Sequence, residues 1–132
     1  MTPPVLRTIV PCQRITSSGD RPPYSLHDVT FTIRLDQSPE NIRLTFALFF
    51  AYTESIFPGH FHLRVYDGIG GRCSFMSPDI PAGIHEDATT VFGQPIEFED
   101  IAFPSPGQYS IHVYWQSQDL GCTYLEVKVS GD

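Results

Sequence analysis

The sequence of 132 residues is poor in positive charge. Eight Lys and Arg residues stand against fifteen Asp and Glu residues, which gives a formal net charge of −7. The basic residues are spread singly along the chain, so they form no stripe that could follow a phosphate backbone. We therefore expect no nucleic-acid partner.

Long apolar runs are absent as well. The longest, at residues 46–52, is far shorter than the roughly 20 residues that span a bilayer. The first residues do not show the basic segment followed by an apolar segment that marks a secretory leader. We expect a cytoplasmic protein with no membrane partner.

Cysteine is scarce, with only Cys12, Cys73 and Cys122. Three cysteines cannot all pair within one chain, and no two of them have the C-x-x-C spacing of zinc or redox sites. No local pattern around them supplies the base and the orienting group that activate a thiolate nucleophile. We expect reduced thiols and a non-catalytic protein.

Apolar and aromatic residues, in contrast, are plentiful. Hydrophobic residues make up 41% of the chain and aromatic residues 13%, including ten Phe and six Tyr. This content is enough to close one core in a chain of this length, so we expect a single domain over residues 1–132.

Alternation of apolar and polar residues, the period of a β-strand, recurs about seven times. No amphipathic helix is indicated. The strands are expected at residues 5–15, 24–35, 42–51, 60–66, 89–103, 109–115 and 123–129, with a short further strand at 73–76 inside an irregular loop at 70–88.

Some segments allow more specific predictions. Pro11 removes a ladder donor, so residues 5–15 form an edge strand or two short pieces. Apolar side chains on both faces make residues 42–51 a central strand. Residues 17–23 have the composition of a loop. In the segment that follows, the core face carries His27, Val29, Phe31, Ile33 and Leu35.

The clearest alternation is at residues 60–66 and 109–115. The turn after the first of these has Gly68, for which we expect a positive φ. In the two segments the inward side chains are Phe61, Leu63, Val65, Tyr109, Ile111, Val113 and Trp115, and the outward ones include His60, His62, Arg64, Tyr66, His112 and Tyr114. Strands without helices predict an all-β fold, a two-sheet antiparallel β-sandwich, immunoglobulin-like or C2-like, of about seven to eight strands.

Three stretches of the chain resemble a family of small bacterial proteins of unknown function. They are PVLRTIVPCQ at residues 4–13, TFALFF at 45–50 and FPSPGQYSI at 103–111. The family consists of predicted β-sandwiches with an FPxPGxY turn before the last hairpin. The resemblance implies the same fold for this chain, and it carries no catalytic residues.

Histidines on one strand face suggest a metal site. His60 and His62 lie two residues apart, so their rings can approach a common ion. His112 is the best third ligand, with His27 or His85 as substitutes. An ordinary polar strand face explains the same residues, and we expect no cofactor unless these histidines hold a divalent metal.

Aromatic side chains on the outward faces suggest an interface, because exposed aromatic residues are typical of one. These residues are Phe49, Tyr52, Tyr66, Tyr114 and Tyr124. The leading hypothesis is therefore a non-catalytic module that binds a protein partner or a second copy of itself. The first alternative is a metal-binding or small-ligand-binding domain built on the histidines. The second is a carbohydrate-binding module that stacks sugars on Tyr66, Tyr114 and Trp115, although we expect Trp115 in the core.

Overall fold

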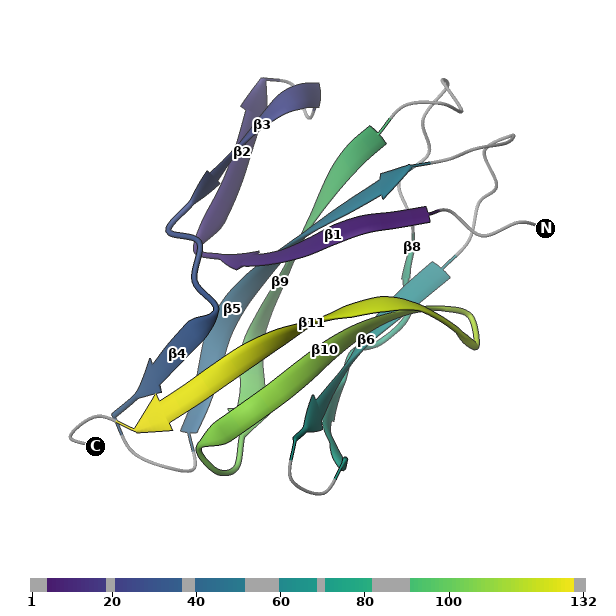
Figure 1. Cartoon of the computed structure of the whole chain (residues 1–132). Helices are drawn as coiled ribbons and strands as arrows, with labels where there is room; N and C mark the ends of the chain where they lie inside the picture. The colour runs from purple at the N-terminus through teal and green to yellow at the C-terminus, as the bar shows by residue number, and fades with distance from the viewer. Residues whose placement is uncertain are drawn as a thin grey trace.

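A computed structural model describes residues 5–18, 21–36, 40–51, 60–68, 71–81 and 91–129. These residues form β-strands and no helix, which confirms the all-β prediction (Figure 1). No helix that could cross a membrane is found in this part of the chain. The strands are β1 (Val5–Cys12), β2 (Arg14–Ser18), β3 (Arg21–His27), β4 (Thr32–Leu35), β5 (Glu40–Ala51), β6 (His60–Asp67), β7 (Cys73–Met76), β8 (Ile80–Pro81), β9 (Val91–Phe103), β10 (Gly107–Trp115) and β11 (Gln118–Val129).

Three of the strands form an antiparallel sheet in the order β1-β5-β9. The predicted central strand is indeed in the middle, and five consecutive side chains of β5 are buried, from Leu44 to Leu48. Strand β1, which contains Pro11, lies at the edge of this sheet as predicted. The chain leaves β1 at Gln13 and starts β2, so the segment at residues 5–15 is both an edge strand and divided.

A six-stranded sheet has the order β4-β11-β10-β6-β7, with β8 also paired to β6. The short strand expected at residues 73–76 is present as β7. Strand β4 runs parallel to β11, from the pair Thr32–Glu126 to the pair Leu35–Val129. The expectation of a wholly antiparallel fold is therefore wrong at this one pairing.

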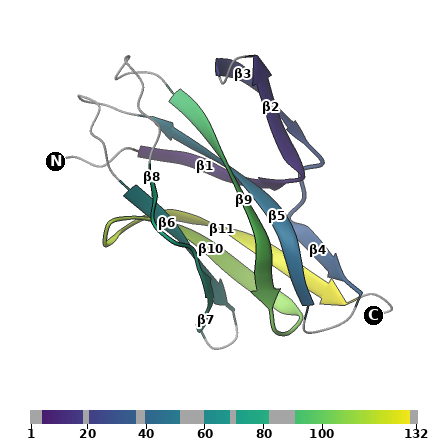
Figure 2. The ribbon, with the colours of Figure 1, turned by 180° about the vertical axis from the view of Figure 1, so that it is seen from behind.

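Strands β2 and β3 form a separate two-stranded sheet, which projects from the end of β1 on the side away from β7 (Figures 1 and 2). The prediction of a loop at residues 17–23 is wrong for residues 17–18 and 21–23, which lie in β2 and β3, and residues 19–20 lie outside the described residues. Two prolines are tolerated in β3 because the register shifts between the pairs Ser17–Tyr24 and Ser18–Arg21, and the prolines lie at this irregularity.

The single strand expected at residues 24–35 is also divided. Asp28 has a φ of 55°, and the Thr30 hydroxyl donates to the Thr32 carbonyl oxygen at 2.7 Å and accepts from the Thr32 N–H at 3.2 Å. These local bonds compete with ladder hydrogen bonds and end the strand. Val29 and Phe31, expected in the core, are consequently 46% exposed each.

One hydrophobic cluster contains side chains from both larger sheets. The inward residues predicted for β6 and β10 are all buried in it, including Trp115 at 8% exposure. The three-stranded sheet contributes Ile9, Leu44, Phe46, Leu48, Ile96, Ile101 and Phe103, and the six-stranded sheet contributes Ile33, Leu35, Phe61, Leu63, Val65, Tyr109, Ile111, Val113, Trp115, Leu125 and Val127.

The FPxPGxY turn is held by its tyrosine. Tyr109 is 1% exposed, its ring packs edge-on against Phe103 with centroids 5.0 Å apart, and its hydroxyl donates to the Ser105 carbonyl oxygen at 2.6 Å. The same hydroxyl accepts from the Ser105 N–H at 3.3 Å. The buried hydroxyl is thus satisfied by the turn that it stabilises.

The turn after β6 differs from its prediction. The positive φ, 63°, belongs to Gly71 and not to Gly68. Gly68 is needed for a different reason: its N–H donates to the Gln108 carbonyl oxygen at 2.7 Å, and a Cβ at this position would lie 2.6 Å from that oxygen. Close approach of two backbones, and not backbone conformation, requires glycine here.

Candidate functional site

The candidate site lies on the face of the six-stranded sheet opposite the core. Along β10, alternate residues are buried from Tyr109 to Trp115, and the residues between them point to the other face. We call this face the outer face. Its residues are adjacent across three strands through the pairs His62–Tyr114, Arg64–His112, Tyr66–Ser110, Cys122–His112 and Tyr124–Ser110.

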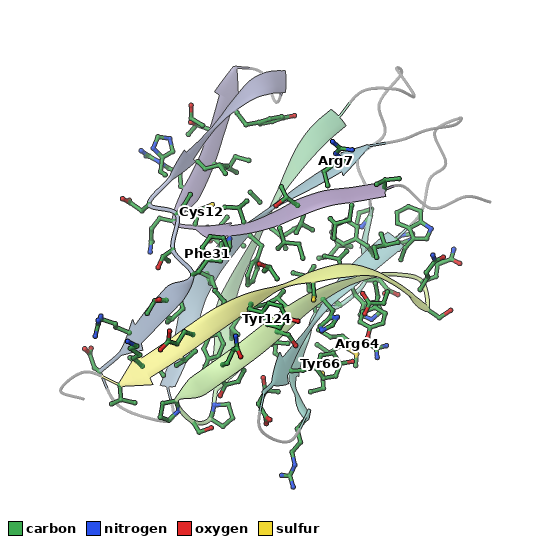
Figure 3. All side chains as sticks on the ribbon, viewed as in Figure 1. Arg7, Cys12, Phe31, Arg64, Tyr66 and Tyr124 are labelled. Atoms are coloured by element: carbon green, nitrogen blue, oxygen red, sulfur yellow. The ribbon has the colours of Figure 1, made fainter. Side chains whose placement is uncertain are left out.

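Arg64 is at the centre of this arrangement, beside Tyr66 (Figure 3). Its Nε donates to Nε2 of His62 at 2.9 Å, and its Nη1 donates to the Tyr66 hydroxyl at 3.4 Å. Its Cζ lies 4.3 Å from the ring centroid of Tyr114, a cation–π contact. Within the described part of the chain, no carboxylate lies at ion-pair distance from Arg64. The hydrogen bond that Arg64 donates to Tyr66 raises the pKa of Arg64, so the site keeps one positive charge.

Two phenols lie next to the guanidinium. The hydroxyl oxygens of Tyr66 and Tyr114 are 3.3 Å apart. This hydrogen bond, followed by desolvation, raises the pKa of Tyr114 to about 12. His62 stacks on the Tyr114 ring with centroids 5.3 Å apart and an interplanar angle of 11°. The aromatic part of the site is therefore a packed group and not a set of separate surface rings.

His62 is on the predicted face, but it is only 8% exposed. Because Arg64 can only donate, Nε2 of His62 accepts, and the proton of the neutral ring is on Nδ1. That Nδ1 atom lies 3.7 Å from a carboxylate oxygen of Asp79. The lone pair that a metal ion would use is thus occupied by the Arg64 hydrogen bond.

His112 has partners on both nitrogens. Nδ1 is 2.9 Å from Oδ2 of Asp119, and Nε2 is 3.1 Å from Oγ of Ser110. Sequence reasoning put Ser110 on the same strand face as His112 but named neither partner. Ser110 could have been named from this pattern. Asp119 could not, because its position depends on the hairpin register, which shifts between Val113 and Tyr114.

The three histidines proposed as metal ligands do not come together. His60 is exposed at the start of β6, opposite Pro81. His62 and His112 both contact the Tyr114 ring, and each is engaged as described above. In the described ranges, no group of three or more His, Cys, Asp or Glu side chains could hold a metal ion. His85 lies outside these ranges, and His27 bonds to the Thr16 hydroxyl.

The proposed interface residues are only partly brought together. Tyr66 and Tyr114 contact each other, and Tyr124, 57% exposed, lies on β11 opposite Ser110 (Figure 3). Tyr52 and the side chain of Phe49 lie outside the described part of the structure. The buried position of Trp115 removes it from the face on which the carbohydrate hypothesis needs it.

Fold and site together define an all-β protein with an outer sheet face rich in tyrosine and histidine around one arginine. Comparison of the sequence with protein-family models and with curated proteins finds no match. The structure is similar to that of the Pseudomonas fluorescens alkylpurine DNA glycosylase AlkC, solved bound to DNA containing an abasic site analog. The TM-score is 0.52 at 16% sequence identity, and the likeness covers 74% of this chain but only 27% of the glycosylase chain. A likeness of this kind concerns the fold.

Proposed function

We propose that this chain is a β-sandwich interaction module that binds a protein partner with its outer face. The sandwich assignment is supported by the single cluster that the two larger sheets share. Tyrosine and arginine are the side chains that most often dominate binding energy at interfaces, and Tyr66, Arg64 and Tyr114 form one contiguous group.

The chemistry of the partner follows from Arg64, and the observation that carries the proposal is that no carboxylate of the described residues lies at ion-pair distance from it. Its Nε–H and one Nη1–H are used within the face, which fixes the plane of the guanidinium. The remaining donors suit a carboxylate, the group that arginine binds in a bidentate manner. The partner segment therefore presents a carboxylate next to an aromatic or apolar side chain. Because this chain has a net charge of −7, a partner with a positive net charge is favoured at long range.

A pair of small probes tests this recognition. N-acetyltyrosine and N-acetyltyrosinamide differ only in the carboxylate, and their binding can be followed by NMR through the backbone N–H groups of Tyr66 and Tyr114, which the wild type and the Arg64 variant share. We expect shifts with the acid and not with the amide, and loss of binding in Arg64→Gln. Arg34→Gln, on the exposed face of β4, is the matched control and should bind normally. Equal binding of acid and amide would refute the proposal.

A second copy of the chain is the alternative partner for the outer face. Light scattering of the wild type and of Arg64→Gln separates the two cases. A monomer that binds the acid probe supports a foreign partner. A dimer that Arg64→Gln dissociates would instead show that the outer face binds another copy.

A further inference from the structure

Ser110, His112 and Asp119 form a continuous chain of hydrogen-bonding groups on the outer face. Ser110 Oγ is 3.1 Å from Nε2 of His112, and Nδ1 of the same ring is 2.9 Å from Oδ2 of Asp119. The other carboxylate oxygen of Asp119 accepts the Gly121 N–H at 2.9 Å, which fixes the carboxylate. The edge of Tyr66 packs against the His112 ring at 5.2 Å and 90°, which fixes the imidazole.

The direction of the hydrogen bonds follows from the groups themselves. An ionised carboxylate only accepts, so the proton of neutral His112 is on Nδ1, facing Asp119. Nε2 then carries a lone pair, and the Ser110 hydroxyl donates to it. A hydroxyl that donates to an imidazole whose other nitrogen is bound to a carboxylate is the arrangement that activates serine nucleophiles.

We infer that Ser110 is a reactive nucleophile that accepts an acyl group from esters, with His112 as its base and Asp119 as a positioning residue. The inference uses residues that carboxylate binding by Arg64 does not need. The inference can therefore be tested independently of the proposed partner recognition. It contradicts the expectation of a non-catalytic protein.

The reaction has two steps. Ser110 Oγ attacks the ester carbonyl carbon as its proton moves to Nε2 of His112. The carbon–oxygen bond to the leaving group then breaks, and the alcohol or phenol leaves with that proton. In the second step, water loses a proton to His112 and attacks the acyl-serine. The carboxylic acid is released, and the proton returns to Ser110.

The neighbours of Ser110 suggest the substrate class. Its cross-strand partners are Tyr66 on one side and Tyr124 on the other. Aromatic rings on both sides favour an aryl ester, which can stack on them. On an open sheet face water is not excluded, which weakens electrostatic stabilisation of the transition state, so we expect slow turnover.

The experiment measures acylation of the intact protein by p-nitrophenyl acetate and phosphonylation by a fluorophosphonate, using mass spectrometry and peptide mapping. We expect one adduct, on Ser110, and none on Ser117. Ser117 is the matched control because it is exposed in the turn after β10 and bonds to no histidine within the described structure. Adducts spread over several serines and tyrosines, or no adduct on Ser110, would overturn the inference.

Variants test the two supporting residues. His112→Gln should slow acylation of Ser110 about a hundredfold, the size of a general-base contribution. Asp119→Asn keeps an acceptor for the Gly121 N–H but puts an amide against Nδ1, so acylation should slow, and Asp119→Glu should restore part of the rate. Unchanged rates in His112→Gln, with the fold intact by circular dichroism, would show that no base acts on Ser110.

Discussion

At the scale of single residues, Tyr114 connects several side chains of the outer face. Its ring stacks on His62 and meets the Arg64 guanidinium, and its hydroxyl bonds to Tyr66. Each of these partners is on β6, so Tyr114 links two strands through side chains as well as through the backbone. The ionisation of the Tyr114 phenol therefore reports whether its contacts with His62, Arg64 and Tyr66 are intact.

We predict that Tyr114 is a late-ionising tyrosine, with a pKa of about 12 against an ordinary 10.0. A raised pKa means that the folded state holds the proton more tightly. This contribution to stability is complete below pH 10 and is lost as the pH rises towards 12. Tyrosinate absorbance should show a step near pH 12 that Tyr114→Phe removes and Tyr124→Phe keeps. A step retained in Tyr114→Phe would contradict the assignment.

Gly68 allows a prediction about backbone contact. In Gly68→Ala the new methyl group meets the Gln108 carbonyl oxygen at 2.6 Å, so backbone must move. We expect a loss of about 1–3 kcal/mol in the free energy of unfolding. In Gly71→Ala the methyl group meets nothing within 4 Å, and only the φ of 63° costs stability, about 1 kcal/mol. Urea denaturation of both variants measures the difference. A larger loss in Gly71→Ala than in Gly68→Ala would show that a methyl group fits at position 68.

At the scale of elements, the alternation of β6 and β10 was predicted correctly because the ladder between these two strands is regular from the pair Asp67–Tyr109 to the pair Phe61–Trp115. The segment at residues 24–35 was misread because the bonds of the Thr30 hydroxyl outweigh a pattern that alone indicates a strand. The start of β3, at residues 21–23, was missed because prolines are normally excluded from strand interiors, and here they lie at a register shift. Local hydrogen bonding, which composition does not reveal, decided both cases.

For the candidate site, the sequence predicts which residues of one strand share a face, but not which residues of neighbouring strands meet. The face of each residue follows from period two, so His62, Tyr66, His112 and Tyr114 were placed correctly on one face. The neighbours across strands follow from register, which the sequence does not fix. The bonds of Arg64 to His62 and of Asp119 to His112 therefore became visible only in the structure.

Strand β10 lies between β11 and β6 in the six-stranded sheet. A cavity on its core side should therefore lower the free energy of unfolding strongly. We predict that Ile111→Ala, at a fully buried position, lowers the free energy of unfolding by about 2–5 kcal/mol. Val29→Ala, at a position 46% exposed, is the control and should stay within about 0.5 kcal/mol. Chemical denaturation followed by Trp115 fluorescence distinguishes them. Equal losses would mean that Val29 is covered in solution.

At the scale of the whole molecule, the cysteines provide a probe of global opening. Cys12 is fully buried, and desolvation raises the pKa of its thiol, whereas Cys73 and Cys122 are exposed. We predict that two thiols react at once with a disulfide reagent in the native protein and that Cys12 reacts only as the molecule unfolds. The Cys12→Ser variant should lack the slow phase. Three fast thiols would contradict the buried position of Cys12.

The parallel pairing of β4 with β11 has a consequence for synthesis on the ribosome. Strand β4 is synthesised well before β11, so Thr32 has no partner strand until Glu126 has been added to the chain. At ordinary elongation rates this delay is on the order of ten seconds. During it, Ile33 and Leu35, both buried in the finished protein, have no β11 to pack beside. We therefore expect nascent chains of this protein to expose an apolar strand for much longer than a hairpin would, and to be bound by chaperones that act at the exit tunnel.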